Sequence, residues 1–258
     1  MASNKCSAIM PGRGTPVVDP KRFSKWRVPT SKVILSLTPR FFDLVNTMAD
    51  SVLEADCPGI IFKCSMVEYG GARILSALLF WGAPAAIAGF ERIVAAGGEE
   101  FIVLGLAGSI HPRARIGDIV VPAWGVREEG TSYHYMPPDY VPKPDSELAN
   151  RLYSMLKVVK GRRRHRLLRG GIWSTDAIFR ETSDKVEKYS SMGVYVVDME
   201  MTAFFAVAHY RKVKLASVIA ISDELFTGEW KTGFEDNRLK RAERILVEAA
   251  LRSLSWKG

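Results

Sequence analysis

Short apolar segments alternate with amphipathic helical segments along most of this chain, and this alternation restricts the possible fold more than any other feature. Apolar runs bounded by glycine, proline or polar residues predict strands at residues 33–37, 59–63, 74–80, 101–104, 119–121, 167–173, 194–197 and 215–221. Apolar residues at helical spacing predict helices at residues 39–53, 82–96, 145–156, 183–191, 199–210 and 237–254. The pattern predicts an α/β fold in which helices flank a mixed, largely parallel central sheet.

The first 32 residues differ from the rest of the chain because they are polar and carry four prolines. We expect residues 1–32 to form an irregular arm and residues 33–258 to form a single domain, since no linker or internal repeat interrupts the alternation. The arm lacks the apolar core of a secretory signal, and no apolar run reaches the ~18–20 residues that span a bilayer. We therefore expect a cytoplasmic protein that does not contact a membrane.

The net charge of +8 is concentrated most sharply at residues 162–166, which include four arginines. Because no aromatic residues are interleaved with this run, we interpret it as a solvated loop and not as a nucleic-acid-binding patch. Cys6, Cys57 and Cys64 show no C-x-x-C spacing, so we favour free thiols, with a Cys57–Cys64 bridge as the alternative. The four histidines lack the spacing of metal ligands, and we expect no metal site.

Polar residues after three predicted strands are the first candidates for a site, because ligands of such sheets bind at the carboxyl ends of strands. Gly105 permits close backbone approach to a ligand, but it equally suits an ordinary turn. Glu200 can accept hydrogen bonds from a diol, or it can simply stabilise a helix N-terminus. Asp223 can act as a general acid, or Ser222 and Asp223 can cap the following segment.

A polar loop at residues 130–137 is a fourth candidate. Its aromatic rings, together with His134, could line a pocket for a flat base, although a packed loop is an equally good interpretation.

Taken together, five segments resemble the nucleoside phosphorylase family, which includes hexameric purine nucleoside phosphorylases and uridine phosphorylases. These segments are residues 103–122, 129–135, 173–177, 197–200 and 221–225, and the resemblance extends in order from about residue 33 to the C-terminus. It implies cleavage of the base–sugar bond of a nucleoside, most simply by phosphorolysis to the free base and ribose 1-phosphate. It also implies a homo-oligomer, either a dimer or a hexamer, that needs no organic cofactor.

The resemblance assigns roles to individual residues. Glu200 is expected to hold the ribose hydroxyls while Met199 packs on the sugar. Asp223 is expected to protonate N7 of the departing base, with Ser222 supporting that position. The base pocket is expected to be lined by Ser174, Ile178 and Phe179. Because uridine phosphorylases generally lack the Ser-Asp pair, the resemblance favours a purine over uridine.

The sequence departs from the family pattern where phosphate would bind. Leu37 and Phe41 stand at the glycine and arginine positions of the family's Gly-Asp-Pro-x-Arg loop, and Val103 and Leu106 replace a further arginine and a hydroxyl residue. Charge-assisted hydrogen bonds are each worth ~1.5–3 kcal/mol, so these changes weaken phosphate binding unless other residues compensate. The residues that could serve the nucleophile side are Gly105, Arg40, Lys63 and Arg73.

Three functions remain open at this point. A phosphorylase with a rearranged anion site is the first hypothesis. The second is a nucleosidase that cleaves a nucleoside or AMP with water in place of phosphate. The third is a nucleoside-binding module without activity, but the presence of both Glu200 and Asp223 argues against it, since a binder does not need an acid for a leaving group.

Overall fold

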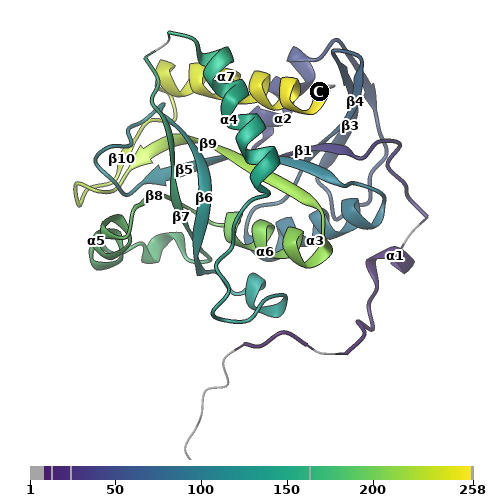
Figure 1. The fold of residues 1–258 in the computed structure, drawn as a ribbon, viewed down its shortest axis with the longest axis horizontal. Coiled ribbons are helices and arrows are strands. Elements are labelled where there is room, and N and C mark those ends of the chain that lie inside the picture. Colours follow the sequence, from purple (N-terminus) through teal and green to yellow (C-terminus); the bar gives the residue numbers. More distant parts are fainter. Residues whose placement is uncertain (1–8, 13, 24, 163, 257–258) are drawn as a thin grey trace, which may run out of the picture.

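The computed structural model describes residues 9–12, 14–23, 25–162 and 164–256, in which ten strands form one sheet in the order β10-β9-β6-β7-β8-β5-β1-β4-β3-β2. The strands are β1 (Lys32–Ser36), β2 (Ser51–Glu54), β3 (Lys63–Tyr69), β4 (Ala72–Leu78), β5 (Glu100–Ser109), β6 (Ile119–Glu128), β7 (Leu167–Thr175), β8 (Val194–Asp198), β9 (Lys214–Glu224) and β10 (Lys231–Thr232). The α-helices are α1 (Pro20–Phe23), α2 (Pro39–Met48), α3 (Ala83–Ala95), α4 (Ser146–Lys160), α5 (Ser183–Ser191), α6 (Met201–Arg211) and α7 (Asn237–Ser255). Two 3-10 turns, η1 (Thr131–His134) and η2 (Ile178–Arg180), lie in the connections. Helices cover both sides of the sheet (Figure 1), and the predicted α/β class is confirmed.

Strand β5 connects the two parts of the sheet. It runs parallel to β1 and, over its whole length, parallel to β9, while its carboxyl end pairs antiparallel with β8. Because β9 also pairs with β6, and β6 leads through β7 to β8, the five strands close into a ring. Strands β4, β3 and β2 extend the sheet outward from β1. The sheet is therefore mixed and largely parallel, as predicted.

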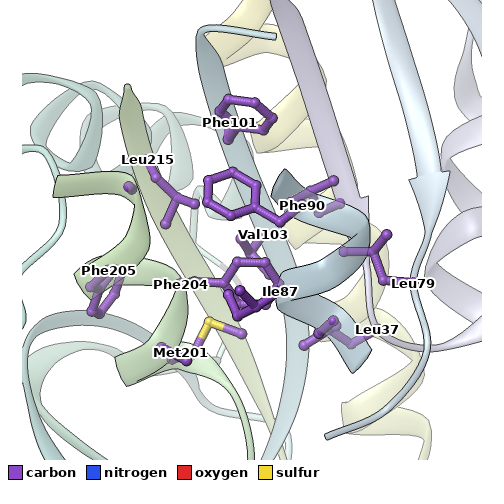
Figure 2. Close-up of a cluster of buried hydrophobic side chains, with 14 of the residues drawn as sticks. Leu37, Leu79, Ile87, Phe90, Phe101, Val103, Met201, Phe204, Phe205 and Leu215 are labelled. Atoms are coloured by element: carbon purple, nitrogen blue, oxygen red, sulfur yellow. The ribbon is translucent and has the colours of Figure 1, made fainter. Parts of the chain in front are cut away.

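Two apolar cores lie on opposite faces of β5, since alternate residues of a strand point to opposite sides. On one face, α3 and α6 pack together, and the Phe90 ring meets Phe101 and Phe204 edge to face at centroid distances of 4.8 and 5.4 Å. Figure 2 shows Val103 within this cluster. On the other face, helices α2, α4 and α7 cover Leu104 and its neighbours. Burial on both sides fixes the position of β5, and with it the loop that follows.

Several predicted bounds differ from those observed, such as the strands predicted at residues 101–104 and 119–121, which extend to Ser109 and Glu128, and two further differences have a clear local cause. The helix predicted at residues 39–53 starts as expected, because the Thr38 hydroxyl accepts a hydrogen bond from the Phe41 amide at 3.3 Å, but it ends at Met48. Ala49 is extended, and the next residues form the edge strand β2, so pairing with β3 replaces the helical spacing of the sequence. The strand predicted at residues 59–63 starts only at Lys63, since the Ile61 amide donates to the Pro58 carbonyl in a turn.

The N-terminal arm meets the domain where the Val28 amide donates to the Ala96 carbonyl at 3.0 Å. Within the described part of residues 1–32, α1 is the only helix, and β1 begins at Lys32. Cys57 and Cys64 are free thiols, while Cys6 lies outside the described residues. None of the helices in the described chain has the length and apolarity that crossing a bilayer requires.

Candidate active site

A cavity of about 420 Å³ opens at the carboxyl ends of β5, β8 and β9. This is the edge at which the sequence predicted a site, and the volume lies within the ~300–1,000 Å³ typical of small-molecule sites. Six of the sequence-predicted residues line this cavity or its rim: Ile178, Phe179, Met199, Glu200, Ser222 and Asp223. The fold therefore brings the carboxyl groups of Glu200 and Asp223, which are separated in the sequence, to the same cavity.

Glu200 reaches the cavity from the junction between β8 and α6. Its side chain is only 6% exposed, and Oε1 accepts a hydrogen bond of 2.7 Å from the Gly82 amide at the start of α3. Burial raises the pKa of Glu200 to about 8, and the nearby charge of Asp198 acts in the same direction. The Oε1 hydrogen bond fixes the carboxyl group while leaving Oε2 available for a ligand.

Asp198 stabilises the junction between β8 and α6 through hydrogen bonds of its carboxyl group. Its Oδ2 accepts from the amides of Glu200 and Met201 at 3.1 and 2.8 Å, and its Oδ1 accepts from the Ser174 hydroxyl at 2.5 Å. The same hydroxyl accepts from the Thr202 amide at 3.0 Å. Ser174 is fully buried and absent from the cavity wall, so its observed contacts are with the α6 N-terminus and not with the base pocket proposed from the sequence.

Asp223 faces the cavity from the end of β9. Its Oδ1 accepts from the Ser222 hydroxyl at 2.6 Å, and its Oδ2 accepts from the Trp230 indole at 2.8 Å. A register shift after Ala107 brings Gly108 opposite Asp223. A Cβ atom on Gly108 would lie 2.9 Å from the Asp223 Oδ2 atom, so this position requires glycine for close approach and not for backbone freedom.

The rim of the cavity is apolar and partly open to solvent. Phe179 is 96% exposed, Trp81 is 70% exposed, and Trp230 and Phe234 also contribute to the rim. The indole N–H of Trp81 donates to the Leu37 carbonyl at 2.5 Å, which holds this ring at the edge of the cavity. Aromatic rings at a cavity mouth suit a flat ligand, since a flat ring can stack on them.

The loop at residues 130–137 does not line the cavity. His134 lies on η1 with an exposed side chain. The guanidinium of Arg127 stacks over the Tyr133 ring at 3.9 Å, and the Tyr133 hydroxyl donates to the Arg127 carbonyl. Within this chain, the packed-loop interpretation describes the segment.

The four residues expected on the nucleophile side are not brought to the cavity. Arg40 forms an ion pair with Glu243 at 2.7 Å, and Arg73 forms one with Glu68 at 3.3 Å. Lys63 begins β3, and Gly105 is buried. Among the described residues, the cavity is lined by no arginine, lysine or histidine, and its ionisable side chains are all acidic: Glu181, Asp198, Glu200 and Asp223.

Glu181 and Trp230 are cavity residues that the sequence analysis missed. Glu181 lies just beyond η2, and Trp230 lies just before β10. Both belong to connections without hydrophobic periodicity, and neither follows a predicted strand directly. Only the pairing of β10 with β9, which brings Trp230 back to Asp223, makes that contact visible.

Fold and cavity together define an α/β protein with a small-molecule site at the carboxyl edge of its sheet. Comparison with known proteins identifies the family: residues 48–253 match the phosphorylase superfamily, and the chain belongs to it. The sequence is similar to a guanosine phosphorylase of Halorubrum lacusprofundi, with 25% identity over 74% of this chain and 78% of that one. It is also similar to a DeoD-type purine nucleoside phosphorylase of Bacillus cytotoxicus, with 27% identity over 62% and 68% of the two chains.

Solved structures agree on the fold. The purine nucleoside phosphorylase of Toxoplasma gondii, in complex with immucillin-H, superposes with a TM-score of 0.79 at 19% identity over 87% of this chain and 90% of that one. The uridine phosphorylase of Vibrio fischeri gives 0.77 at 22% identity over 92% and 94%. The resemblance noted in the sequence is therefore confirmed, and with it membership of a family of pentosyltransferases.

Proposed function

We propose that this protein cleaves the N-glycosidic bond of a purine nucleoside by phosphorolysis, releasing the base and ribose 1-phosphate. The observation that carries the proposal is the convergence of Glu200 and Asp223 on one cavity of about 420 Å³ at the carboxyl edge of the sheet. One carboxyl group after β8 and another at the end of β9 suit a ligand with a diol at one end and a nitrogen base at the other.

Glu200 is the residue we assign to the sugar. Its Oε1 is engaged by the Gly82 amide, so Oε2 is the atom that meets the ribose hydroxyls. Met199 lines the cavity beside it and offers an apolar surface for the ribose ring. Holding the sugar in this way aligns C1′ for attack and converts part of the binding energy into positioning.

Asp223 is the residue we assign to the base. Cleavage leaves negative charge on the departing purine, and a proton or hydrogen bond delivered to N7 stabilises it. The Ser222 hydroxyl and the Trp230 indole each donate to one carboxyl oxygen of Asp223, which fixes the orientation of the group. A fixed acid at the base end lowers the barrier because no reorientation is needed as the bond breaks.

We also propose a homo-oligomer. The segment from Leu75 to Leu79 is buried inside the chain, but Phe80 and Trp81 that follow it are exposed. Phe80 stacks edge to face with the exposed Phe62 at 5.3 Å, next to the cavity rim. An apolar patch at this place suits contact with a second copy, which could add cations to the cavity.

Hydrolysis is the second candidate, and the acidic lining favours it. A phosphate dianion ~6 Å from a carboxylate is repelled by roughly 3 kcal/mol per unit of charge at an effective dielectric constant of ~20. Leu37 and Leu106 offer no side-chain donor at the positions where the family binds phosphate. Water needs no counter-charge and would be the nucleophile if the cavity remains acidic in the assembled protein.

The experiment that tests the proposal measures base release from inosine, guanosine, adenosine, methylthioadenosine, AMP and uridine, with and without phosphate. The sugar product is identified in each case. Phosphate-dependent formation of ribose 1-phosphate supports phosphorolysis, whereas phosphate-independent release of ribose supports hydrolysis. Release from uridine alone would contradict the purine assignment, and binding without turnover would make the protein a nucleoside-binding module.

A further inference from the structure

A group of arginines outside the cavity has no part in the proposed reaction. Three segments that are far apart in the sequence carry these arginines: the turn before β6, the connection between α4 and β7, and the start of α7. None of the five lines the cavity. We name this surface the arginine patch, and it consists of Arg113, Arg162, Arg164, Arg166 and Arg238.

The buried carboxyl group of Asp118 holds the three segments of the patch together. Asp118 is 1% exposed, and its Oδ1 accepts from the Arg166 amide at 2.9 Å and pairs with the Arg238 guanidinium at 3.5 Å. Its Oδ2 accepts from the Arg115 amide at 3.0 Å. The Arg166 guanidinium in turn donates to the Arg113 carbonyl at 2.9 Å. Because one buried group contacts all three segments, the fold fixes their positions relative to one another.

The connection between α4 and β7 is anchored at His165. This side chain is 6% exposed, and its Nδ1–H donates to the Gly117 carbonyl at 2.7 Å. Arg164 and Arg166, on either side of His165, are exposed. Cations on a fixed backbone lose less conformational freedom on binding an anion than cations on a free loop do. The patch is therefore preorganised for an anionic ligand.

The chain does not neutralise the positive charge of the arginine patch. Among the described residues, Asp118 is the only carboxylate that pairs with any of the five arginines, and it reaches only Arg238. Lys157 and Lys160 lie at the end of α4 that leads into the patch, and they add two cations without an ion pair. Helices α4 and α7, which carry part of this charge, pack against each other on one side of the sheet (Figure 1). Charges of one sign that gather on one surface attract an oppositely charged partner.

The residue types of the patch indicate which anion it suits. A planar guanidinium group can donate to two phosphate oxygens at once, which a lysine ammonium cannot do. Several fixed guanidinium groups therefore suit a ligand with several phosphates in a row, as in the backbone of a nucleic acid.

The aromatic residues decide between a single strand and a double helix. Proteins that bind single strands stack the bases on aromatic rings. The patch contains no aromatic residue, and the Tyr153 ring on α4 is already in contact with Lys157 and Arg169, at 4.8 and 5.0 Å. The lack of interleaved aromatic residues, which favoured a solvated loop in the sequence, argues against base stacking but not against phosphate contacts. A double helix, which presents its phosphates and keeps its bases stacked inside, is the form that fits.

We propose that the arginine patch binds double-helical nucleic acid through its phosphates, without reading the base sequence. This binding goes beyond the proposed function, because the patch lies outside the cavity. It also replaces the interpretation of residues 162–166 as a loop that only meets solvent.

The test measures the fluorescence anisotropy of labelled DNA and RNA duplexes of about 30 base pairs on titration with the assembled protein, from about 50 to about 200 mM KCl. A single strand of the same length and vesicles containing an anionic phospholipid are tested under the same conditions. The patch variant Arg162→Glu/Arg164→Glu is compared with wild type and with Lys143→Glu/Lys188→Glu. This matched control changes the net charge equally at exposed positions of other segments. A second patch variant, Arg162→Gln/Arg164→Gln, removes the two charges without adding acidic groups.

Wild type should bind a duplex with an affinity that falls steeply with salt. If the five arginines each contact one phosphate, the logarithm of the association constant falls by roughly 4 to 5 per tenfold rise in salt. We expect the glutamate variant to weaken duplex binding by at least about tenfold at the lowest salt, and both patch variants to reduce this slope by about 2. The control should keep the slope of wild type, and base release should be the same in all four proteins.

The absence of duplex binding by wild type at the lowest salt would overturn the inference. An equal loss in the patch variants and in the control would overturn it too, because net charge alone would then explain the binding. Tighter binding of the single strand than of either duplex, or binding of vesicles without binding of a duplex, would also count against it. Binding of either duplex that is lost only in the patch variants supports it, and the tighter duplex identifies the form that the patch accepts. Since none of the altered residues lines the cavity, a failure of base release would refute the proposed function and leave this test unaffected.

Discussion

Replacing Glu200 by glutamine should stabilise the protein while removing its activity. The side chain is 6% exposed, and burial raises its pKa from 4.5 to about 8. At pH 7 the unfolded chain releases this proton, whereas the folded chain mostly keeps it. The difference lowers the free energy of unfolding by at most ~3 kcal/mol, which is a large part of the 5–15 kcal/mol of a typical domain.

The sign of the pH dependence follows from the raised pKa. Below about pH 4 both states hold the proton, and Glu200 has no such effect. As the pH rises towards 8, the unfolded state is increasingly favoured, and above 8 the difference is constant. Glutamine cannot ionise, and its carbonyl oxygen can still accept from the Gly82 amide. The stability gain of Glu200→Gln should therefore be small at pH 5 and reach ~1–3 kcal/mol at pH 8.

Urea unfolding of wild type, Glu200→Gln and the exposed control Glu187→Gln should be measured from pH 5 to pH 8.5 at one protein concentration, because assembly would otherwise change the apparent stability. Base release is measured on the same samples. A stability difference that does not change with pH would refute the argument that the cavity keeps Glu200 protonated. Activity equal to wild type on ribosides would remove Glu200 from sugar binding.

Two further variants test the base end of the cavity. Asp223→Asn should lower kcat by ~10²–10⁴-fold with an unchanged circular dichroism spectrum, since it removes the proton donor, and unchanged turnover would exclude Asp223 from the mechanism. Gly108→Ala places a Cβ atom 2.4 Å from the Leu225 Cδ1 atom and 2.9 Å from the Asp223 Oδ2 atom. It should lower both the activity and the free energy of unfolding, the latter by ~1–3 kcal/mol in a thermal or urea melt. Wild-type activity and stability would show that the backbone at Gly108 can shift to accommodate a Cβ atom.

The fold could be predicted from sequence because strand and helix periods are local properties. The central strands β1, β5 and β9 are apolar runs, and helix starts such as Thr38–Pro39 carry capping chemistry. The edge strand β2 was missed because its residues are exposed and continue a helical spacing. The closure of β5, β9, β6, β7 and β8 into a ring was also missed, since it depends on pairings between strands far apart in the chain.

Strand positions alone predict the site only where its residues closely follow strands, and the cavity residues Ile178 and Phe179 were predicted from the family resemblance instead. Glu200 and Asp223 satisfied this rule, and both line the cavity. Ser174 also lies near a strand end, but its hydroxyl bonds to the Asp198 carboxyl group and the Thr202 amide and does not reach the cavity. Sequence spacing does not predict these two contacts. No local sequence pattern marks Glu181, because only the tertiary structure brings it to the cavity wall near Asp198 and Asp223.

Two of the four changes at the positions where the resemblance places phosphate form one coherent alteration of the core, while Phe41 and Leu106 belong to the cluster on the opposite face. Leu37 and Val103 belong to the same buried cluster as Phe90, and Figure 2 shows all three side chains around α3. An arginine at position 103 would enter this apolar cluster and would need an anion as its counter-charge. With leucine and valine there, the core is complete without phosphate, and the floor of the cavity keeps no fixed positive charge of its own. If phosphate is the nucleophile, as we propose, cations from outside the cavity of one chain must hold it, and their absence from the assembled protein would make water the nucleophile.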